Sequence, residues 1–421
     1  MAKRISAFSL LILLAGLVLM RCQSPSEPDG ADYSVLPRAL TAEEIQLAAS
    51  ADRFGLKLFR EVVRQEVDKN IFISPLSVSM ALGMTANGAA GSTLDSMRAT
   101  LELADLTEAE SNAAYQSLIE LLTEADPKVR FDIANSIWYR DIWTFNADFL
   151  GRCQDYFDAV VRGLDFSDPA AADTINTWVD ENTQGKIEEI VVKPIDPDIV
   201  MFLINAIYFK GTWTYEFDPE NTRDDVFNLL DGSQAGCRMM EQRSEYPYLS
   251  TDQFQMVDLP YGDGLFTMTI FLPRTNVHVD SLIAQFTPEN WQLWISSLAP
   301  DSGDIQLPKF TLEYELKMNA VLKALGMGIA FGEGAVDFSR LIDPAGLIWI
   351  GKVKHKTFVQ VDEEGTEAAA ATVVTMVLSA GGGHSTGFVM RVDRPFVFVI
   401  RERTSGALLF MGKIVEPVWE E

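Results

Sequence analysis

Histidine and cysteine, the side chains that most often serve as metal ligands or nucleophiles, are scarce in this chain. Histidine occurs at positions 278, 355 and 384, and cysteine at positions 22, 153 and 237. No two of them stand at the spacing of a metal-binding pair, and three cysteines are too few for a disulfide scaffold or a zinc ribbon. No nucleophile is accompanied by a recognisable base in any motif. We therefore expect neither an enzyme nor a bound metal or other cofactor.

The segment 363–387 carries the pattern that is most suggestive of function. If it forms a strand, one face has no charge and begins with small side chains: Thr366, Ala368, Ala370, Thr372, Val374, Met376 and Leu378. Such a face could slide between existing strands. An ordinary surface loop or a permanent central strand would share the pattern. However, a segment of about 25 residues without a helix inside a compact domain is more often functional than idle.

Helices and strands of a single domain must position this segment. The capping pair Thr41 and Glu44 predicts a helix whose apolar positions are Ile45, Leu47, Phe54, Leu58, Phe59 and Val62. A second helix is expected after Ser74 and Pro75, and two more over 174–181 and 316–325. Strands are expected over 131–139, 202–209, 256–260 and 266–272, with a final hairpin formed by 395–400 and 407–415. No second linker interrupts this pattern, which favours one α+β domain.

The order of short motifs along the chain resembles that of the serpins. These motifs lie at 70–82, 88–93, 174–179, 183–187, 203–213, 308–310, 325–327, 337–339, 355–356, 363–372, 393–396 and 410–413. Each motif alone is weak, but together they keep the family's order and cover about residues 50–417. The resemblance implies the serpin fold, an α+β fold with three β-sheets, eight or nine helices and an exposed reactive-centre loop at about 363–390.

The resemblance also implies an inhibitory mechanism for serine proteases. In inhibitory members the protease cuts the loop and forms an acyl-enzyme, and the loop then inserts into the main sheet, so that the inhibitor is consumed. The residues that match the family's hinge are Glu363, Glu364, Gly365, Thr366, Glu367, Ala368, Ala369, Ala370, Ala371 and Thr372. Because these residues are mostly small and uncharged, we expect the inhibitory type.

Two further groups of residues are assigned by the resemblance. A shutter beneath the main sheet would contain Ser74, Ser77, Asn205 and His355, where hydrogen bonds must break and re-form as the sheet opens. A breach at the top of the sheet would contain Trp213, Lys309 and Glu363, with Lys309 and Glu363 expected to pair. The family's usual spacing places the reactive bond between Ser379 and Ala380, with Leu378 as the alternative for the residue before the cut.

The residues around this bond predict the class of target. The stretch from Met376 to Ala380 has no Lys or Arg, which favours elastase-, subtilisin- or chymotrypsin-like proteases over trypsin-like ones. The part of the loop beyond the cut, up to Pro395, is about five residues longer than usual. We interpret the run Gly381 to Gly383 as a flexible part of this longer connection.

The first forty residues are typical of an exported protein. Lys3 and Arg4 precede an apolar stretch too short for a comfortable bilayer span, so we interpret residues 1–21 as a signal peptide, 22–40 as a flexible tether and 41–421 as the serpin domain. Cys22 stands where a bacterial lipoprotein would carry its lipid, although Arg21 is unusual before such a cysteine. We expect a bacterial protein that is either secreted or lipid-anchored to the cell envelope through Cys22.

Charge and composition limit the partners. The 421 residues contain 60 acidic against 34 basic side chains, a formal charge of −26, which disfavours nucleic acid and polyanion partners. We expect a monomer that forms covalent complexes with serine proteases. The alternative is a non-inhibitory serpin-fold binding protein at the cell surface.

Overall fold

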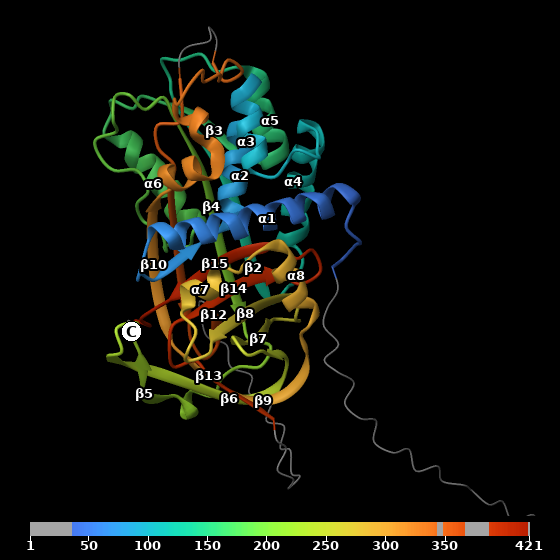
Figure 1. The fold of residues 1–421 in the computed structure, drawn as a ribbon. Coiled ribbons are helices and arrows are strands. Elements are labelled where there is room, and N and C mark those ends of the chain that lie inside the picture. Colours follow the sequence, from blue (N-terminus) through green and yellow to red (C-terminus); the bar gives the residue numbers. More distant parts are fainter. Residues whose placement is uncertain (1–35, 343–347, 367–386, 420–421) are drawn as a thin grey trace, which may run out of the picture. The chain divides into compact units, whose positions relative to one another are not determined.

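The computed structural model describes residues 36–342, 348–366 and 387–419. Several residues of the predicted sites lie outside these ranges: Cys22, Glu367, Ala368, Ala369, Ala370, Ala371, Thr372, Leu378, Ser379 and Ala380. The described chain combines nine α-helices with two sheets, so the predicted α+β class is confirmed (Figure 1).

A six-stranded sheet, hereafter the main sheet, carries the start of the 363–387 segment. Its strand order is β10 (Phe310–Lys317), β11 (Lys354–Val361), β12 (Gly365–Thr366), β4 (Met201–Thr212), β2 (Val129–Arg140) and β3 (Val160–Leu164). All neighbours are antiparallel except β2 and β3, which run parallel. The predicted strands over 131–139 and 202–209 are therefore confirmed as β2 and β4.

The second sheet has nine strands in the described ranges and forms the centre of the hydrophobic core. Its order is β1 (Ile71–Ile73), β15 (Leu408–Ile414), β14 (Phe396–Glu402), β8 (Phe266–Pro273), β7 (Phe254–Tyr261), β6 (Gln234–Ser250), β9 (Ala299–Pro308) and β13 (Phe388–Arg391), with β5 (Arg223–Asn228) beside β6. Strands β7, β8, β14 and β15 are buried along their whole length, and apolar residues make up most of each. The resemblance implies three sheets, whereas the described strands form two. The reason is that the long strand β6 pairs with both β7 and β9 and so joins two of the three expected sheets into one.

The nine helices of the described chain surround these sheets. They are α1 (Ala42–Gln65), α2 (Pro75–Ala86), α3 (Gly91–Thr100), α4 (Glu108–Thr123), α5 (Ala147–Phe157), α6 (Ala170–Asn182), α7 (Val279–Ile283), α8 (Pro288–Ser296) and α9 (Asn319–Leu322). The predicted capping box of Thr41 and Glu44 is present at the start of α1. The Ser74 side chain caps α2 by accepting from the Ser77 amide. In the described ranges no helix is long and apolar enough to cross a membrane.

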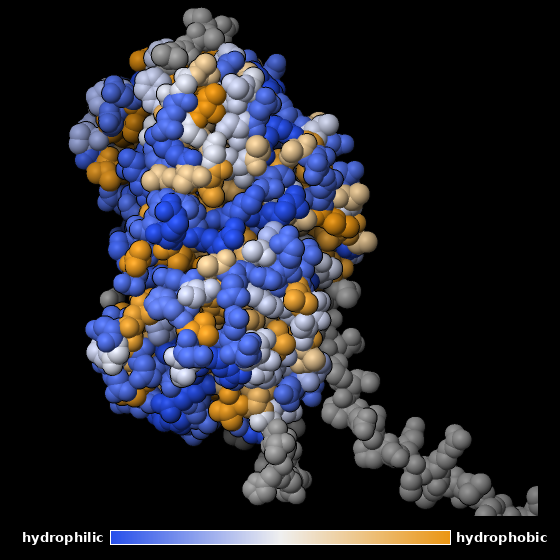
Figure 2. Space-filling model, viewed as in Figure 1, coloured by the Kyte–Doolittle hydropathy of each residue, from blue (hydrophilic) through white to orange (hydrophobic). Residues whose placement is uncertain are grey.

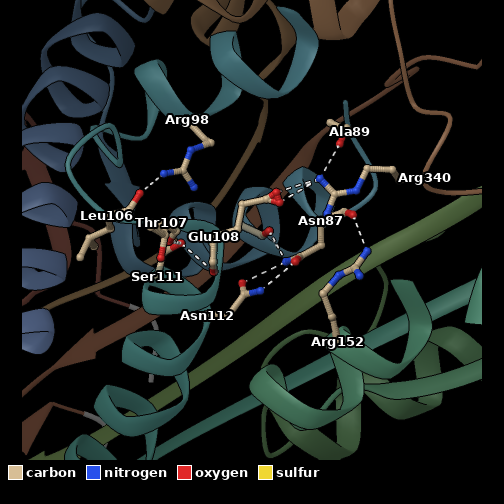
Figure 3. Close-up of polar contacts among 11 residues, drawn as sticks. Asn87, Ala89, Arg98, Leu106, Thr107, Glu108, Ser111, Asn112, Arg152 and Arg340 are labelled. Carbon is tan, nitrogen blue, oxygen red and sulfur yellow. Dashed lines mark hydrogen bonds and ion pairs between the residues drawn. The ribbon is translucent and has the colours of Figure 1, made fainter. Parts of the chain in front are cut away.

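Polar contacts link helices α2, α4 and α5 (Figure 3). Asn87 after α2 and Asn112 on α4 exchange two buried amide hydrogen bonds of 3.1 and 2.8 Å. Both oxygens of Glu108, at the start of α4, accept from Arg340 at 2.8 Å. Arg152 on α5 donates to the Asn87 carbonyl at 3.0 Å. Asn87 thus connects α2 to both α4 and α5.

The surface is mostly polar on the face that Figure 2 shows, with apolar side chains in small separate groups. Large exposed apolar side chains of the described residues include Ile142, Val192 and Leu293, which come from distant segments of the chain. Single exposed apolar residues are normal for a folded protein.

The structure corrects two details of the sequence prediction. Ile45, expected on the buried face of α1, is 56% exposed. The helix expected over 316–325 begins later, because β10 continues to Lys317, and α9 starts only at Asn319. The helix was expected to end at Gly326, and there the backbone is indeed not helical: φ is 112°, a value that glycine adopts more readily than other residues.

Part of the segment interpreted as a tether contacts the domain. Leu36 is buried in the core, and the Arg38 guanidinium pairs with Glu44 and donates to Ser117.

The two cysteines in the described ranges, Cys153 and Cys237, are free thiols. Burial raises the pKa of Cys153 to about 12 and that of Cys237 to about 11. Neither is therefore a reactive thiolate at neutral pH.

Candidate functional site

Gly365 and Thr366, near the start of the predicted loop, lie inside the main sheet as β12. Thr366 is paired with Val361 of β11 on one side and with Gly211 of β4 on the other. The chain reverses between β11 and β12 in a tight turn, where Asp362 Oδ1 accepts from the amides of Glu364 and Gly365 at 3.1 and 3.3 Å. Strand β12 therefore separates β11 from β4 at this end of the sheet.

Position 365 requires glycine. A Cβ atom at Gly365 would lie 2.1 Å from the carbonyl oxygen of Gly211, far inside the contact distance of two such atoms. Thr366 is buried, and its hydroxyl lies 2.5 Å from the Tyr261 hydroxyl. The Tyr261 ring stacks on Trp213 with centroids 4.4 Å apart and an angle of 12°. Sequence reasoning missed Tyr261, since it ends a uniformly buried strand and belongs to no motif.

The three residues assigned to the breach meet around the turn before β12. Lys309 Nζ lies 2.6 Å from Glu363 Oε2, and the exposed fractions of the two side chains are 15% and 12%. Trp213 donates from its backbone amide to Glu364 and from its indole to the Asp362 carbonyl, at 2.8 and 3.0 Å. Burial opposes ionisation of Glu363, but hydrogen bonds from Lys309 and Thr222 outweigh it and lower the pKa. The pair is thus a largely desolvated one, which makes removal of either partner costly.

Three of the four residues assigned to the shutter form one hydrogen-bonded chain. The Ser74 amide donates to His355 Nε2 at 3.0 Å, and the Ser74 hydroxyl donates to the Leu409 carbonyl at 2.7 Å. The Ser77 amide donates to the Ser74 hydroxyl at 3.2 Å. Burial lowers the pKa of His355 to about 4, so this imidazole is neutral and accepts a hydrogen bond.

Asn205, the fourth, faces the other way. Its Nδ2 donates to Asn135 Oδ1 of the neighbouring strand β2 at 2.8 Å, and Asn135 in turn donates to the Phe157 carbonyl at the end of α5. Among the residues that the structure describes, Asn205 Oδ1 is buried and meets no hydrogen-bond donor. Asn135 was not predicted, although an asparagine inside an apolar strand is a signal that could have found it. Buried acceptors without a partner are uncommon in folded proteins, so Asn205 Oδ1 stands out at this site.

A small cavity of about 20 Å³ lies next to the end of β12. Thr366 borders it, together with β4 and β11, and the segment after α6 covers it; the lining includes Ile207, Phe209, Phe358, Val359, Thr183 and Lys186. Lys186 Nζ lies 4.9 Å from the centre of the Phe358 ring. A volume of this size holds about one water molecule and no side chain. A side chain could therefore enter this cavity only if its lining moved.

These features define a class of protein: one whose main sheet already holds the first residues of a long loop between two strands. The comparisons with known proteins agree with it. Residues 49–417 match the family model described as Serpin (serine protease inhibitor). The chain is 35% identical over 387 residues to Iripin-2 of the tick Ixodes ricinus, covering 90% of this chain and 96% of that protein.

Solved structures agree as well. The thermophilic serpin tengpin in its native state superposes with a TM-score of 0.80 at 31% identity, covering 91% of this chain and 96% of tengpin. Human thyroxine-binding globulin complexed with thyroxine also gives a TM-score of 0.80, at 28% identity and with coverage of 90% and 100%. The chain belongs to the serpin family. The predicted serpin fold is confirmed.

Proposed function

We propose that this serpin inhibits serine proteases as a suicide substrate. The protease serine attacks the carbonyl carbon of Ser379, an ester to the enzyme forms, and the amide bond to Ala380 breaks as the new amine takes up a proton. The freed segment that ends at Ser379 then enters the main sheet and pulls the bound protease with it. Hydrolysis of the ester stalls because the displaced protease loses its active-site geometry.

The observation that carries this proposal is the position of β12. Gly365 and Thr366 are already paired between β4 and β11, and the turn that reverses the chain is already formed. Further insertion would therefore extend a strand whose first pairs exist. The covered cavity beside Thr366 lies where the next residues would enter.

The strand register supports a specific end point for the hinge. In an antiparallel ladder each step forward along the loop is one step back along both neighbours. Six steps from Thr366 reach Thr372, while six steps back from Gly211 and Val361 reach Asn205 and His355. Continued insertion would thus place Thr372 between these two shutter residues, where its hydroxyl could donate to the unpartnered Asn205 Oδ1.

Incubation with elastase- and subtilisin-like proteases tests the proposal. A complex that survives heat and detergent on a denaturing gel is expected, and the mass of the fragment released after reaction locates the cut. A cut after Ser379 or Leu378 agrees with a target whose primary pocket is small or apolar. Complete cleavage of the loop without any such complex, across a panel of these proteases, would refute inhibition.

The second candidate is a non-inhibitory binding protein of the same fold. Its support is the likeness to thyroxine-binding globulin, which was solved with thyroxine bound. The two functions differ in the effect of loop cleavage on stability. Insertion should raise the melting temperature by tens of degrees, whereas a binding protein with a loop that does not insert should melt unchanged after the cut.

The proposed site of action is outside the cell. The short apolar stretch after Lys3 and Arg4, followed by Cys22, supports export by a bacterium and lipid attachment. The test is expression of the full chain in a bacterial host with labelled fatty acid. We expect labelled protein in the membrane fraction, and loss of the label in Cys22→Ser. Unlabelled protein in the medium would show secretion and exclude the lipid anchor.

A further inference from the structure

The C-terminal residues Val418 and Trp419 pack against the breach. The Thr311 amide at the start of β10 donates to the Val418 carbonyl at 2.7 Å. This contact places the Trp419 ring over Lys309, with Nζ 4.0 Å from the ring centre. The distance is well within the range of a cation–π interaction, and tryptophan is the ring that binds cations most strongly.

Lys309 connects this tail to the turn before β12. It lies between β9 and β10, and its backbone amide is fixed by the Arg238 carbonyl at 2.8 Å. The same Nζ that contacts the Trp419 ring forms the 2.6 Å ion pair with Glu363. The ammonium group is therefore held between an aromatic face and a carboxylate.

Glu363 in turn is fixed to the body of the domain. Its second carboxylate oxygen accepts from Thr222 at 2.7 Å, and its carbonyl accepts from the Phe217 amide at 2.9 Å. Gly365, where β12 begins, is two residues further on. A change in the Lys309–Glu363 pair is thus transmitted directly to the turn that starts the inserted strand.

We propose that Trp419 is a positioning residue for the hinge, acting on Glu363 through Lys309. The ring covers the ion pair from water and attracts the ammonium, so that the carboxylate is held at the turn. This inference rests on the proposed function, because positioning of the hinge matters for inhibition only if the loop inserts. It predicts that loss of the ring loosens 362–366 without loosening the core.

Hydrogen exchange of the intact full chain, measured by mass spectrometry, reports that loosening directly. Trp419→Ala should speed exchange of the amides in 362–366 roughly fivefold to tenfold, as expected from one cation–π contact. Trp419→Phe keeps an aromatic face and should stay within roughly twofold to threefold of the wild type. Peptides from β14 should be unchanged, and Trp143→Ala, which removes a tryptophan that is 42% exposed beyond the other end of β2, serves as the matched control.

A double-mutant cycle with Glu363→Gln separates positioning from general packing. If Trp419 acts through the ion pair, Trp419→Ala should change exchange at 362–366 less than roughly twofold in the Glu363→Gln background. An equal effect in both backgrounds, an equal effect in β14, or no effect of Trp419→Ala would overturn the proposal. Because the exchange is measured without a protease, failure of inhibition itself would appear separately, as the absence of a covalent complex with the wild-type chain.

Discussion

The described residues at the two ends of the predicted reactive loop approach a sheet in the same way but in different surroundings. At the proximal end, a Cβ at Gly365 would lie 2.1 Å from the Gly211 carbonyl; at the distal end, a Cβ at Gly387 would lie 2.1 Å from the Ser302 carbonyl. Each glycine lets the loop approach the backbone of a sheet closely. Each is followed by a buried residue, Thr366 or Phe388.

The surroundings differ in whether the strand can grow. Strand β12 has antiparallel neighbours on both sides and a cavity beside its last residue. Strand β13 pairs only with β9 among the described strands, in parallel, and Phe388 stacks on Tyr248 with centroids 3.8 Å apart. Under the proposed mechanism, this difference would let the loop enter the sheet from its proximal end while its distal end keeps its place.

The largest effect is expected from a charge at the proximal end. Thr366→Arg would place a cation against Tyr261 in a fully buried position, which insertion cannot tolerate. The expected result is conversion to a plain substrate: the protease cuts the loop, no covalent complex accumulates, and cleavage no longer raises the melting temperature. The control is Val389→Arg, at a position of β13 that is 60% exposed, which should leave complex formation intact. Complex formation by Thr366→Arg would show that β12 is not the start of insertion.

The second effect concerns the stability of the distal anchor. Phe388→Ala removes a buried ring stacked on Tyr248 and should destabilise the intact protein by about 3–5 kcal/mol. Since this end does not move on insertion, the ratio of covalent complex to cleaved inhibitor should stay that of the wild type. Thermal unfolding and gel quantification on the same samples check both statements. A change in the ratio would mean that the distal anchor takes part in insertion.

The resemblance could assign hinge and shutter residues because they fall within short motifs of the chain, and the structure describes Glu363 to Thr366 and the four shutter residues. Residues 70–82 and 363–372 each combine several unusual residues within a short stretch. By contrast, Tyr261 and Trp419 make their contacts with segments far away in the sequence, and nothing in their immediate neighbours distinguishes them. Ile45 was misplaced for a related reason, because an apolar residue near a helix end fits the helical period whether or not another element covers it. Ion pairing of Lys309 with Glu363 could be anticipated, but its burial depends on the tail that covers it.

The third effect depends on pH and concerns the shutter, where His355 lies on β11 six residues before Val361, the residue that pairs with Thr366. His355 has a pKa of about 4 in the folded protein because burial disfavours its charged form, against about 6.5 when unfolded. The folded state binds the His355 proton less tightly than the unfolded state does. The free energy of unfolding is therefore undiminished above pH 6.5 and falls as the pH drops from 6.5 to 4, by about 2 kcal/mol at pH 5 and about 3 kcal/mol at pH 4.

The measurement is urea unfolding of wild type and His355→Gln across this range. Glutamine keeps an oxygen that can accept from the Ser74 amide but does not titrate. The difference in unfolding free energy between the two proteins reports His355 alone. Asp52 also titrates in the folded protein, since burial raises its pKa to about 8, but it is present in both proteins and its effect has the opposite sign: it lowers stability as the pH rises. A difference that does not depend on pH between 4 and 7 would contradict the assignment of His355 as buried and neutral.

The smallest effect compares one ion pair at each end. The proximal pair of Lys309 and Glu363 is 15% and 12% exposed, whereas the distal pair of Arg391 and Asp225, 2.7 Å apart, is 41% and 16% exposed. Glu363→Gln leaves a largely buried ammonium without its counter-charge and should cost roughly 1–3 kcal/mol. Asp225→Asn removes a pair open to water and should cost less than about 1 kcal/mol. Urea unfolding at low and high salt distinguishes them, since salt should weaken the distal pair more than the proximal one. If the two substitutions cost the same and respond equally to salt, the two anchors do not differ in how they exclude water.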